Sequence, residues 1–272
     1  MRLSILLLLA IGLFPAVAGA KEADPLIELQ TADQARAWEA VGRVNMIGTG
    51  FCTGTLISPR LVLTAAHCMY DKHTGRRVDV SEIEFMAGWR DGRSAAQRKA
   101  RRVMINKDYR YLTDKRLDRV AADIALIELD RPIDTKRIKP FGWSQRPQVG
   151  QVVKVVSYAK GRENEPSMER ACKVLGKNPN VLVLSCHVNF GASGAPIFVM
   201  ENGVPRIASV VSAKAEWNTE KVSLGASLGQ PLQQMIAQME TTNGLFRKVQ
   251  DVSSDLTTLT GGNGAGGGFR KP

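Results

Sequence analysis

Gly191-Ala192-Ser193-Gly194-Ala195-Pro196 follows a short strand-like run, Val181–Leu184, and places one serine between small residues. A glycine-flanked turn of this kind can expose a hydroxyl group and direct backbone N–H groups at a developing negative charge. The pattern also occurs in ordinary turns, so by itself it only nominates Ser193 as a candidate nucleophile.

Two further segments supply the partners that a serine nucleophile needs. Leu63-Thr64-Ala65-Ala66-His67-Cys68 contains a candidate base, because an imidazole titrates near neutral pH. Asp123-Ile124-Ala125-Leu126-Ile127-Glu128-Leu129 begins with an aspartate that heads an apolar strand, where a buried charge needs a partner. Alone, His67 would be interpreted as a structural histidine and Asp123 as a strand-end cap. Together with Ser193 they predict a base, its orienting carboxylate and a nucleophile.

These segments and their chain order resemble the chymotrypsin/trypsin family of serine peptidases over about residues 43–230. The resemblance implies peptide-bond hydrolysis through an acyl-enzyme. We expect no cofactor, and with only three histidines the sequence does not imply a metal ion. The resemblance also implies an oxyanion hole built from the backbone N–H groups of Gly191 and Ser193, and a hydrogen bond from Ser212 to the aspartate. An acyl hydrolase of another fold would carry Gly-x-Ser-x-Gly in the order Ser, Asp, His, which this chain lacks.

One position departs from the animal digestive branch of that family. There an aspartate precedes the nucleophile and pairs with an N-terminal amine that zymogen cleavage releases. Ala192 stands at this position, and the chain before Gly42 lacks Ile-Val-Gly-Gly. The pattern is closer to the bacterial trypsin-like branch, and it predicts activity after signal removal alone.

The spacing from Ser193 places the floor of a specificity pocket at His187 and its wall at Val211-Ser212-Ala213-Lys214. A pocket for Arg or Lys needs a carboxylate at its floor. Because His187 is not a carboxylate, cleavage after basic residues is disfavoured. His187 and Lys214 favour acidic or small residues before the scissile bond. In the alternative interpretation, His187 points into the barrel wall and Lys214 into water.

From Gly42 onward, short β-rich runs bounded by Gly or Pro predict an all-β fold closed into barrels. The resemblance implies two six-stranded antiparallel barrels, over about residues 42–130 and 148–230, with the active site in the cleft between them. Arg131–Pro147, which contains three prolines, is interpreted as the linker. The predicted strands cover 42–47, 50–58, 61–64, 83–89, 100–106, 124–130, 151–158, 169–175, 181–187, 196–200, 205–212 and 222–227.

Local signals predict two helices and one hairpin. Thr31 and Gln34 form a capping-box pattern that opens a short helix through about Glu39. Asn202-Gly203 is a strong turn signal between two strands. Pro231–Met239 has helical spacing, and the resemblance implies that this C-terminal helix packs on the second barrel.

The chain ends predict an exported protein with a flexible tail. Residues 1–20 have a positive start, the apolar run Leu3–Phe14 and a small-residue cleavage site after Ala20. That run is too short for a transmembrane helix, so we expect a secreted or periplasmic protein without a membrane span. The peptidase domain is predicted over 21–240, and residues 241–272 are predicted to be a flexible glycine-rich tail.

Four cysteines fit an oxidising compartment, where three pairings are possible. A turn at 176–180 would bring Cys172 opposite Cys186, and the family resemblance implies Cys52–Cys68. Each bridge closes a loop of about fifteen residues. A zinc site is the competing interpretation, but neither spacing is Cys-x-x-Cys, so no metal site is predicted.

The formal net charge is +11, and the densest basic cluster lies at 98–102. Because no aromatic residues are interleaved with it, we expect no nucleic-acid binding. The expected partner is a protein or peptide substrate, and the expected state is a monomer. The alternative function is a catalytically silent homologue that binds acidic partners through its basic surface. The presence of all three candidates, His67, Asp123 and Ser193, favours catalysis.

Overall fold

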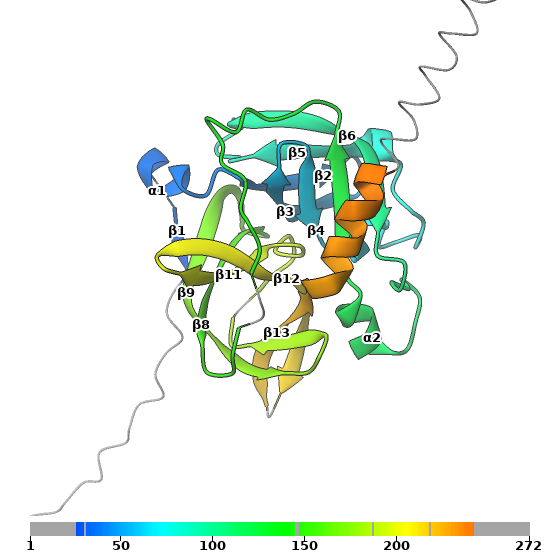
Figure 1. The fold of residues 1–272 in the computed structure, drawn as a ribbon, viewed down its shortest axis with the longest axis vertical. Helices are drawn as coiled ribbons and strands as arrows, with labels where there is room; N and C mark the ends of the chain where they lie inside the picture. The colour runs from blue at the N-terminus through cyan, green and yellow to red at the C-terminus, as the bar shows by residue number, and fades with distance from the viewer. Residues whose placement is uncertain (1–25, 30, 145–146, 187, 218, 242–272) are drawn as a thin grey trace, which may run out of the picture.

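The computed structural model describes residues 26–29, 31–144, 147–186, 188–217 and 219–241. These residues form two β-barrels, the first in the upper half of Figure 1 and the second in the lower half. The predicted signal peptide, the tail beyond residue 241 and His187 lie outside the described residues.

The first barrel is antiparallel and closes in the order β2-β3-β4-β7-β6-β5, because β5 pairs back to β2. Its inward side chains, such as Leu56, Phe85 and Leu126, are completely buried, and closure leaves no unpaired strand edge. The strands are β2 (Val41–Met46), β3 (Gly50–Ser58), β4 (Leu61–Thr64), β5 (Ile83–Ala87), β6 (Ala96–Ile105) and β7 (Ala125–Leu129).

The second barrel closes through β8, which pairs with both β9 and β11. A short strand, β1 (Ile27–Glu28), pairs with Ser167 and Met168 in the N-terminal half of β9. The predicted pair of six-stranded antiparallel barrels is therefore confirmed. The remaining strands are β8 (Val152–Ala159), β9 (Arg162–Lys177), β10 (Val181–Leu184), β11 (Pro196–Glu201), β12 (Val204–Trp217) and β13 (Glu220–Ser227).

In the described part of the chain helices are few, and those before the C-terminal helix are short. The predicted capping box is present at the start of α1 (Ala32–Arg36), where the Thr31 side chain accepts from the backbone N–H of Gln34. The chain also forms α2 (Arg116–Ala121) and two 3-10 turns, η1 (Ala66–Met69) and η2 (Val80–Glu82). Among the described residues, no helix has both the length and the apolar character needed to cross a membrane.

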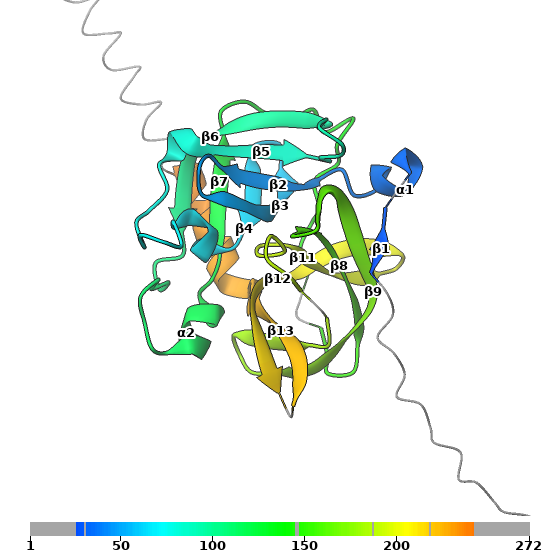
Figure 2. The same ribbon diagram turned by 180° about the vertical axis from the view of Figure 1, so that it is seen from behind.

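The C-terminal helix, which covers residues 229–241, lies along the first barrel (Figures 1 and 2). Arg102 on β6 explains this position, because its Nη2 donates a 3.0 Å hydrogen bond to the carbonyl of Met239 and its Nε lies 2.9 Å from the buried Glu128 carboxylate. Leu232 and Met239 are buried in the same cluster as Leu126. The expectation that this helix packs on the second barrel is therefore wrong.

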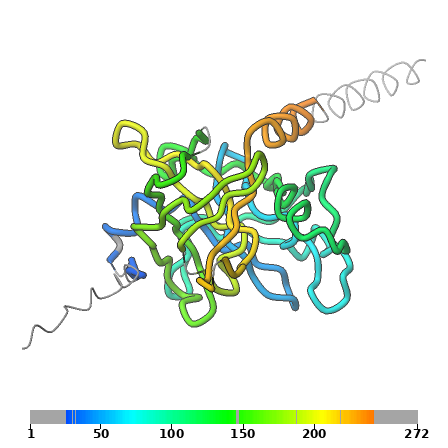
Figure 3. Tube along the Cα trace, turned by 90° about the horizontal axis from the view of Figure 1, so that it is seen from below, coloured from blue at the N-terminus to red at the C-terminus, as the bar shows by residue number. Residues whose placement is uncertain are grey.

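One hydrophobic cluster spans the two barrels, and a separate cluster that includes Val155 and Ile197 fills the second barrel. In the view from below in Figure 3, the green and yellow strands of the second barrel overlie the blue and cyan strands of the first. Phe198 on β11 contacts Phe141 in the linker and Trp38 near α1, with ring centroids 4.6 and 5.1 Å apart. Both predicted disulfides, Cys52–Cys68 in the first barrel and Cys172–Cys186 in the second, are confirmed. Each barrel thus contains one stabilising disulfide, and aromatic side chains pack across the interface between the barrels.

Candidate active site

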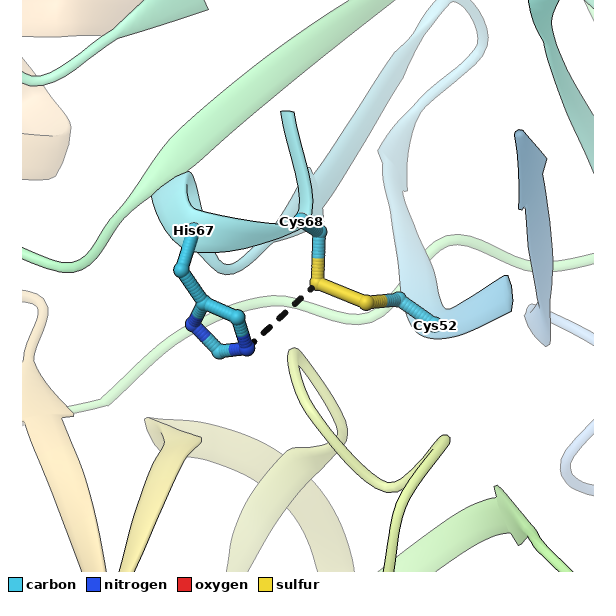
Figure 4. Close-up of side chains that lie close together, drawn as sticks. All are labelled: Cys52, His67 and Cys68. Atoms are coloured by element: carbon cyan, nitrogen blue, oxygen red, sulfur yellow. Dashed lines mark hydrogen bonds between the residues drawn. A yellow bond between two sulfur atoms is a disulfide. The ribbon is translucent and has the colours of Figure 1, made fainter. Parts of the chain in front are cut away.

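His67 lies on η1, the turn that follows β4. The small side chains of Ala65 and Ala66 are completely buried and let this turn lie directly against the barrel core. Cys68 is bonded to Cys52 on β3, so the turn is covalently tied to the neighbouring strand (Figure 4). Nε2 of the imidazole lies 3.9 Å from Cys68 Sγ, also drawn in Figure 4. The imidazole therefore projects from a short segment with little freedom.

The Asp123 carboxylate holds the other side of this imidazole. Its Oδ2 lies 2.6 Å from Nδ1 of His67, and its Oδ1 accepts a 2.8 Å hydrogen bond from the His67 backbone N–H. The Ser212 hydroxyl on β12 donates to Oδ2. These three hydrogen bonds compensate a charged side chain that is only 3 % exposed. The contact between Nδ1 and Oδ2 places the proton of the neutral ring on Nδ1 and leaves Nε2 as an acceptor.

The same contacts set the titration of His67. Burial of the imidazole disfavours its charged form, but the charge of Asp123 and its hydrogen bond favour that form more strongly. The pKa of His67 is therefore raised above its ordinary value of 6.5. The guanidinium of Arg119 acts in the opposite direction and limits this rise.

The peptide groups of the serine loop around Ser193 are oriented by hydrogen bonds that the Phe190 and Ala192 carbonyls accept. The Phe190 carbonyl accepts a 2.7 Å hydrogen bond from the Lys160 N–H, and the Ala192 carbonyl accepts a 3.0 Å hydrogen bond from the Ala195 N–H. In a trans peptide the C=O and N–H groups point in opposite directions, so the N–H groups of Gly191 and Ser193 face away from these partners. Neither N–H group donates a hydrogen bond to another described residue, and Gly191 and Ser193 both line the cavity that His67 lines.

Two glycines make this loop possible. Gly191 and Gly194 have φ values of +92° and +77°, in the left-handed region that favours glycine. A Cβ atom on Gly194 would lie 2.2 Å from Thr64 Oγ1 and 2.4 Å from the Thr53 carbonyl oxygen. The loop is therefore pressed against the first barrel at this point.

His67 and Ser193 line one cavity of about 780 Å³ at the seam between the barrels. Within the described part of the chain, no hydrogen bond joins the Ser193 hydroxyl to Nε2 of the imidazole. Such bonds are often long without substrate and shorten when it binds. The geometry thus joins His67 and Asp123 directly, and it brings Ser193 to the same cavity from the other barrel.

The predicted pocket residues are placed only in part. His187 lies outside the described residues, so its proposed place at the pocket floor stays a prediction. Lys214 lines the cavity; its Nζ donates a 3.0 Å hydrogen bond to Asn189 Oδ1 and lies 5.0 Å from the Phe190 ring centroid. Cationic side chains outnumber acidic ones in this lining, with Lys72, Arg116, Lys160 and Lys214 against Glu163.

Two clusters bring potential metal ligands together, but their sulfur atoms are already bonded. One contains Cys52, His67 and Cys68, and the other contains Glu169, Cys172 and Cys186. In each, both cysteines form a disulfide, so neither offers the thiolate that a metal ion would bind.

Sequence reasoning missed two residues that act on this site. Arg119, at the end of α2, influences the imidazole electrostatically, but a lone arginine before Asp123 gives no pattern. Thr53 on β3 bonds to the serine loop from the first barrel. Its only sequence signal is a threonine directly after Cys52 in a strand with both faces buried.

Comparison with known proteins agrees with this geometry. The Trypsin family profile matches residues 29–226, which is most of the chain. The chain belongs to the trypsin family. Among solved structures, one titled as a Glu endopeptidase in complex with MPD covers 80 % of this trypsin-family chain and 97 % of its own, with a TM-score of 0.66 and 18 % identity. At that identity the likeness shows the fold alone.

Curated relatives match over part of their length. The thrombin-like enzyme acutin of Deinagkistrodon acutus is 31 % identical over 116 residues, which are 40 % of this chain and 42 % of that protein. Serine protease 23 of Macaca mulatta is 30 % identical over 171 residues, which are 56 % of this chain and 44 % of that protein. The matched region thus spans less than half of each of these relatives.

Proposed function

We propose that this trypsin-family chain is a secreted serine endopeptidase with His67, Asp123 and Ser193 as its catalytic triad. The observation that carries the proposal is the 2.6 Å contact between Asp123 Oδ2 and His67 Nδ1, at a cavity that Ser193 also lines. Membership of the trypsin family supports the same reaction class.

In the proposed mechanism, Ser193 Oγ attacks the carbonyl carbon of the scissile bond while Nε2 of His67 takes the hydroxyl proton. Asp123 stabilises the imidazolium that forms. The N–H groups of Gly191 and Ser193 donate to the oxyanion, and the imidazolium then gives its proton to the leaving amine. His67 then takes a proton from water, which attacks the carbonyl carbon of the resulting ester. As the bond from that carbon to Ser193 Oγ breaks, the imidazolium gives its proton to Oγ and the acid is released.

Covalent labelling tests the chemistry. A fluorophosphonate should label the mature chain, and Ser193→Ala should abolish labelling and lower kcat by about 10⁵–10⁶. Ser81→Ala, which removes an exposed serine hydroxyl that donates a hydrogen bond to Asp79, is the matched control and should label like the parent. An unlabelled parent chain that still binds acidic proteins would instead support the catalytically silent alternative.

Export and activation form the next part of the proposal. Two disulfides are typical of an oxidising compartment, in keeping with the predicted signal peptide. Ala192 offers no carboxylate to a new N-terminus, so removal of residues 1–20 should suffice for activity. N-terminal sequencing of exported protein should begin at Lys21. Protein that stays inert until it is cut near residue 40 would contradict this activation route.

The proposed substrate class is a peptide with an acidic residue before the scissile bond. The excess of cationic side chains around the cavity supports this preference, and Lys214 lies on the predicted pocket wall. In a peptide panel that varies this residue, Glu or Asp should be cleaved faster than Lys or Arg. Lys214→Gln should reduce the difference in cleavage rate between acidic and basic residues. Lys221→Gln, at a residue outside the cavity lining, should leave that difference unchanged. Fastest cleavage after Arg or Lys would overturn the preference.

A further inference from the structure

We infer that the Thr53 side chain is a positioning residue that orders the serine loop from the opposite barrel. The inference rests on the proposed function, because the loop matters through the oxyanion site that it carries. Thr53 is completely buried on β3, and Gly191 lies 138 positions further along the chain. The residue would act through the loop and does not contact the substrate.

Three hydrogen bonds connect Thr53 to the segments around the site. Its hydroxyl donates to the Gly191 carbonyl at 2.8 Å and accepts from the Tyr158 N–H at 3.1 Å. Its own backbone N–H donates to the Ser193 carbonyl at 2.9 Å. The Tyr158 carbonyl, at 3.3 Å, is the more distant alternative acceptor for the hydroxyl. The carbonyl groups of Gly191 and Ser193, the two residues that carry the proposed oxyanion N–H groups, are therefore both bonded to Thr53.

These bonds restrict the peptide groups on both sides of Gly191. The preceding carbonyl, that of Phe190, is held by the Lys160 N–H, and the Gly191 carbonyl is held by the Thr53 hydroxyl. With both carbonyls held, the Gly191 N–H cannot rotate away from the cavity without breaking one of these bonds. Phe51, two residues before Thr53, closes the remaining space, since a Cβ on Gly191 would lie 2.4 Å from its ring.

Ala192 explains why such a bond is needed. Its side chain is buried and apolar, so it gives the loop no ionic anchor. In place of an ion pair, the Thr53 hydroxyl supplies a neutral hydrogen bond to the loop, and this bond forms when the two barrels pack together. The loop is then ordered by folding and needs no cleavage of the chain.

The test compares Thr53→Val, which keeps the shape but removes the hydroxyl, with Thr53→Ser, which keeps the hydroxyl. Thr53→Val should lower kcat by about 10²–10³ with little change in KM, the effect of losing one oxyanion donor. It should weaken a peptide aldehyde inhibitor by a similar factor. Thr53→Ser should stay within about tenfold of the parent in both measurements. If Thr53→Val does not fold, Thr53→Ala takes its place.

Ser209→Ala is the matched control for loss of a buried hydroxyl. Ser209 is completely buried and donates a 2.6 Å hydrogen bond to the Ala226 carbonyl on the neighbouring strand. It should lower Tm as Thr53→Val does, but leave kcat near that of the parent. A kcat for Thr53→Val within tenfold of the parent, or a Thr53→Ser variant as impaired as Thr53→Val, would overturn the inference.

Amide hydrogen exchange separates this inference from the proposed function. Peptides that span 188–195 should exchange faster in Thr53→Val than in the parent, Thr53→Ser or Ser209→Ala, whether or not the parent cleaves peptides. Unchanged exchange in Thr53→Val would refute the positioning role. An unlabelled parent with the expected exchange pattern would refute only the proposed peptidase activity.

Discussion

The Ser212 hydroxyl of β12 donates a hydrogen bond to Oδ2 of Asp123, the same oxygen that lies 2.6 Å from Nδ1 of His67. A strand of the second barrel thereby restricts a carboxylate that belongs to the first. The orientation of the imidazole thus depends on correct packing of the two barrels.

Ser212→Ala should lower kcat/KM by about 10- to 100-fold, because a hydrogen bond to a charged group contributes roughly 1.5–3 kcal/mol. The loss should appear mainly in kcat, measured under saturating peptide. Ser185→Ala, which removes a hydroxyl that accepts a hydrogen bond from the Lys173 N–H on β9 and does not contact Asp123, provides the comparison. Equal rates for the two variants would contradict a role for Ser212 in orienting Asp123.

The raised pKa of His67 predicts the pH dependence. The neutral imidazole is the proposed base, so kcat/KM should fall as pH is lowered through a midpoint above 6.5. Arg119 disfavours the imidazolium, so Arg119→Gln should move that midpoint to higher pH. Arg60→Gln, on the exposed turn between β3 and β4, should leave it in place. A midpoint at or below 6.5, or a downward shift in Arg119→Gln, would contradict the assignment.

The Cys52–Cys68 disulfide should stabilise both the fold and the position of the imidazole. Replacement of both cysteines by alanine should lower the free energy of unfolding by about 3 kcal/mol and reduce kcat, because η1 loses its tie to β3. The Cys172–Cys186 disulfide closes a similar loop, with a sequence separation of 14 against 16, so the variant with alanine at both positions is the comparison. Its stability loss should be similar, while the acid midpoint of the pH profile should stay unchanged. Chemical denaturation and pH profiles measure the two effects.

Much of the strand arrangement was predictable because short buried strands leave a strong apolar pattern. β3 and β4 have the predicted bounds, since Gly50 and the Pro59 turn limit them sharply. β9 begins at Arg162, seven residues before the predicted start at Glu169. That extension is polar and resembles a loop, but β1 pairs with part of it and Trp89 bonds to the Glu163 carbonyl.

Other features depend on contacts that no local pattern records. α2 has only six residues, too few for a helical period to emerge. The position of the C-terminal helix depends on Arg102, which lies 137 positions before Met239. The contact between Thr53 and Gly191 is similarly remote. The segments that carry His67, Asp123 and Ser193 could be identified from their own residues, whereas the residues that hold these segments in place could not.

The close approach of Gly194 to the first barrel gives the last prediction. Gly194→Ala adds a Cβ 2.4 Å from the Thr53 carbonyl oxygen and 2.8 Å from the Ala65 backbone nitrogen, so the serine loop must move. Gly203→Ala, in the β11–β12 hairpin, has a similar φ of +80° but an open surrounding, so it imposes only the backbone strain of about 1–2 kcal/mol. Gly194→Ala should therefore lower Tm further than Gly203→Ala and reduce kcat at least 100-fold, the cost of a misplaced oxyanion donor. Equal kcat values for the two variants, measured on the same peptide, would show that the loop does not need this contact with the first barrel.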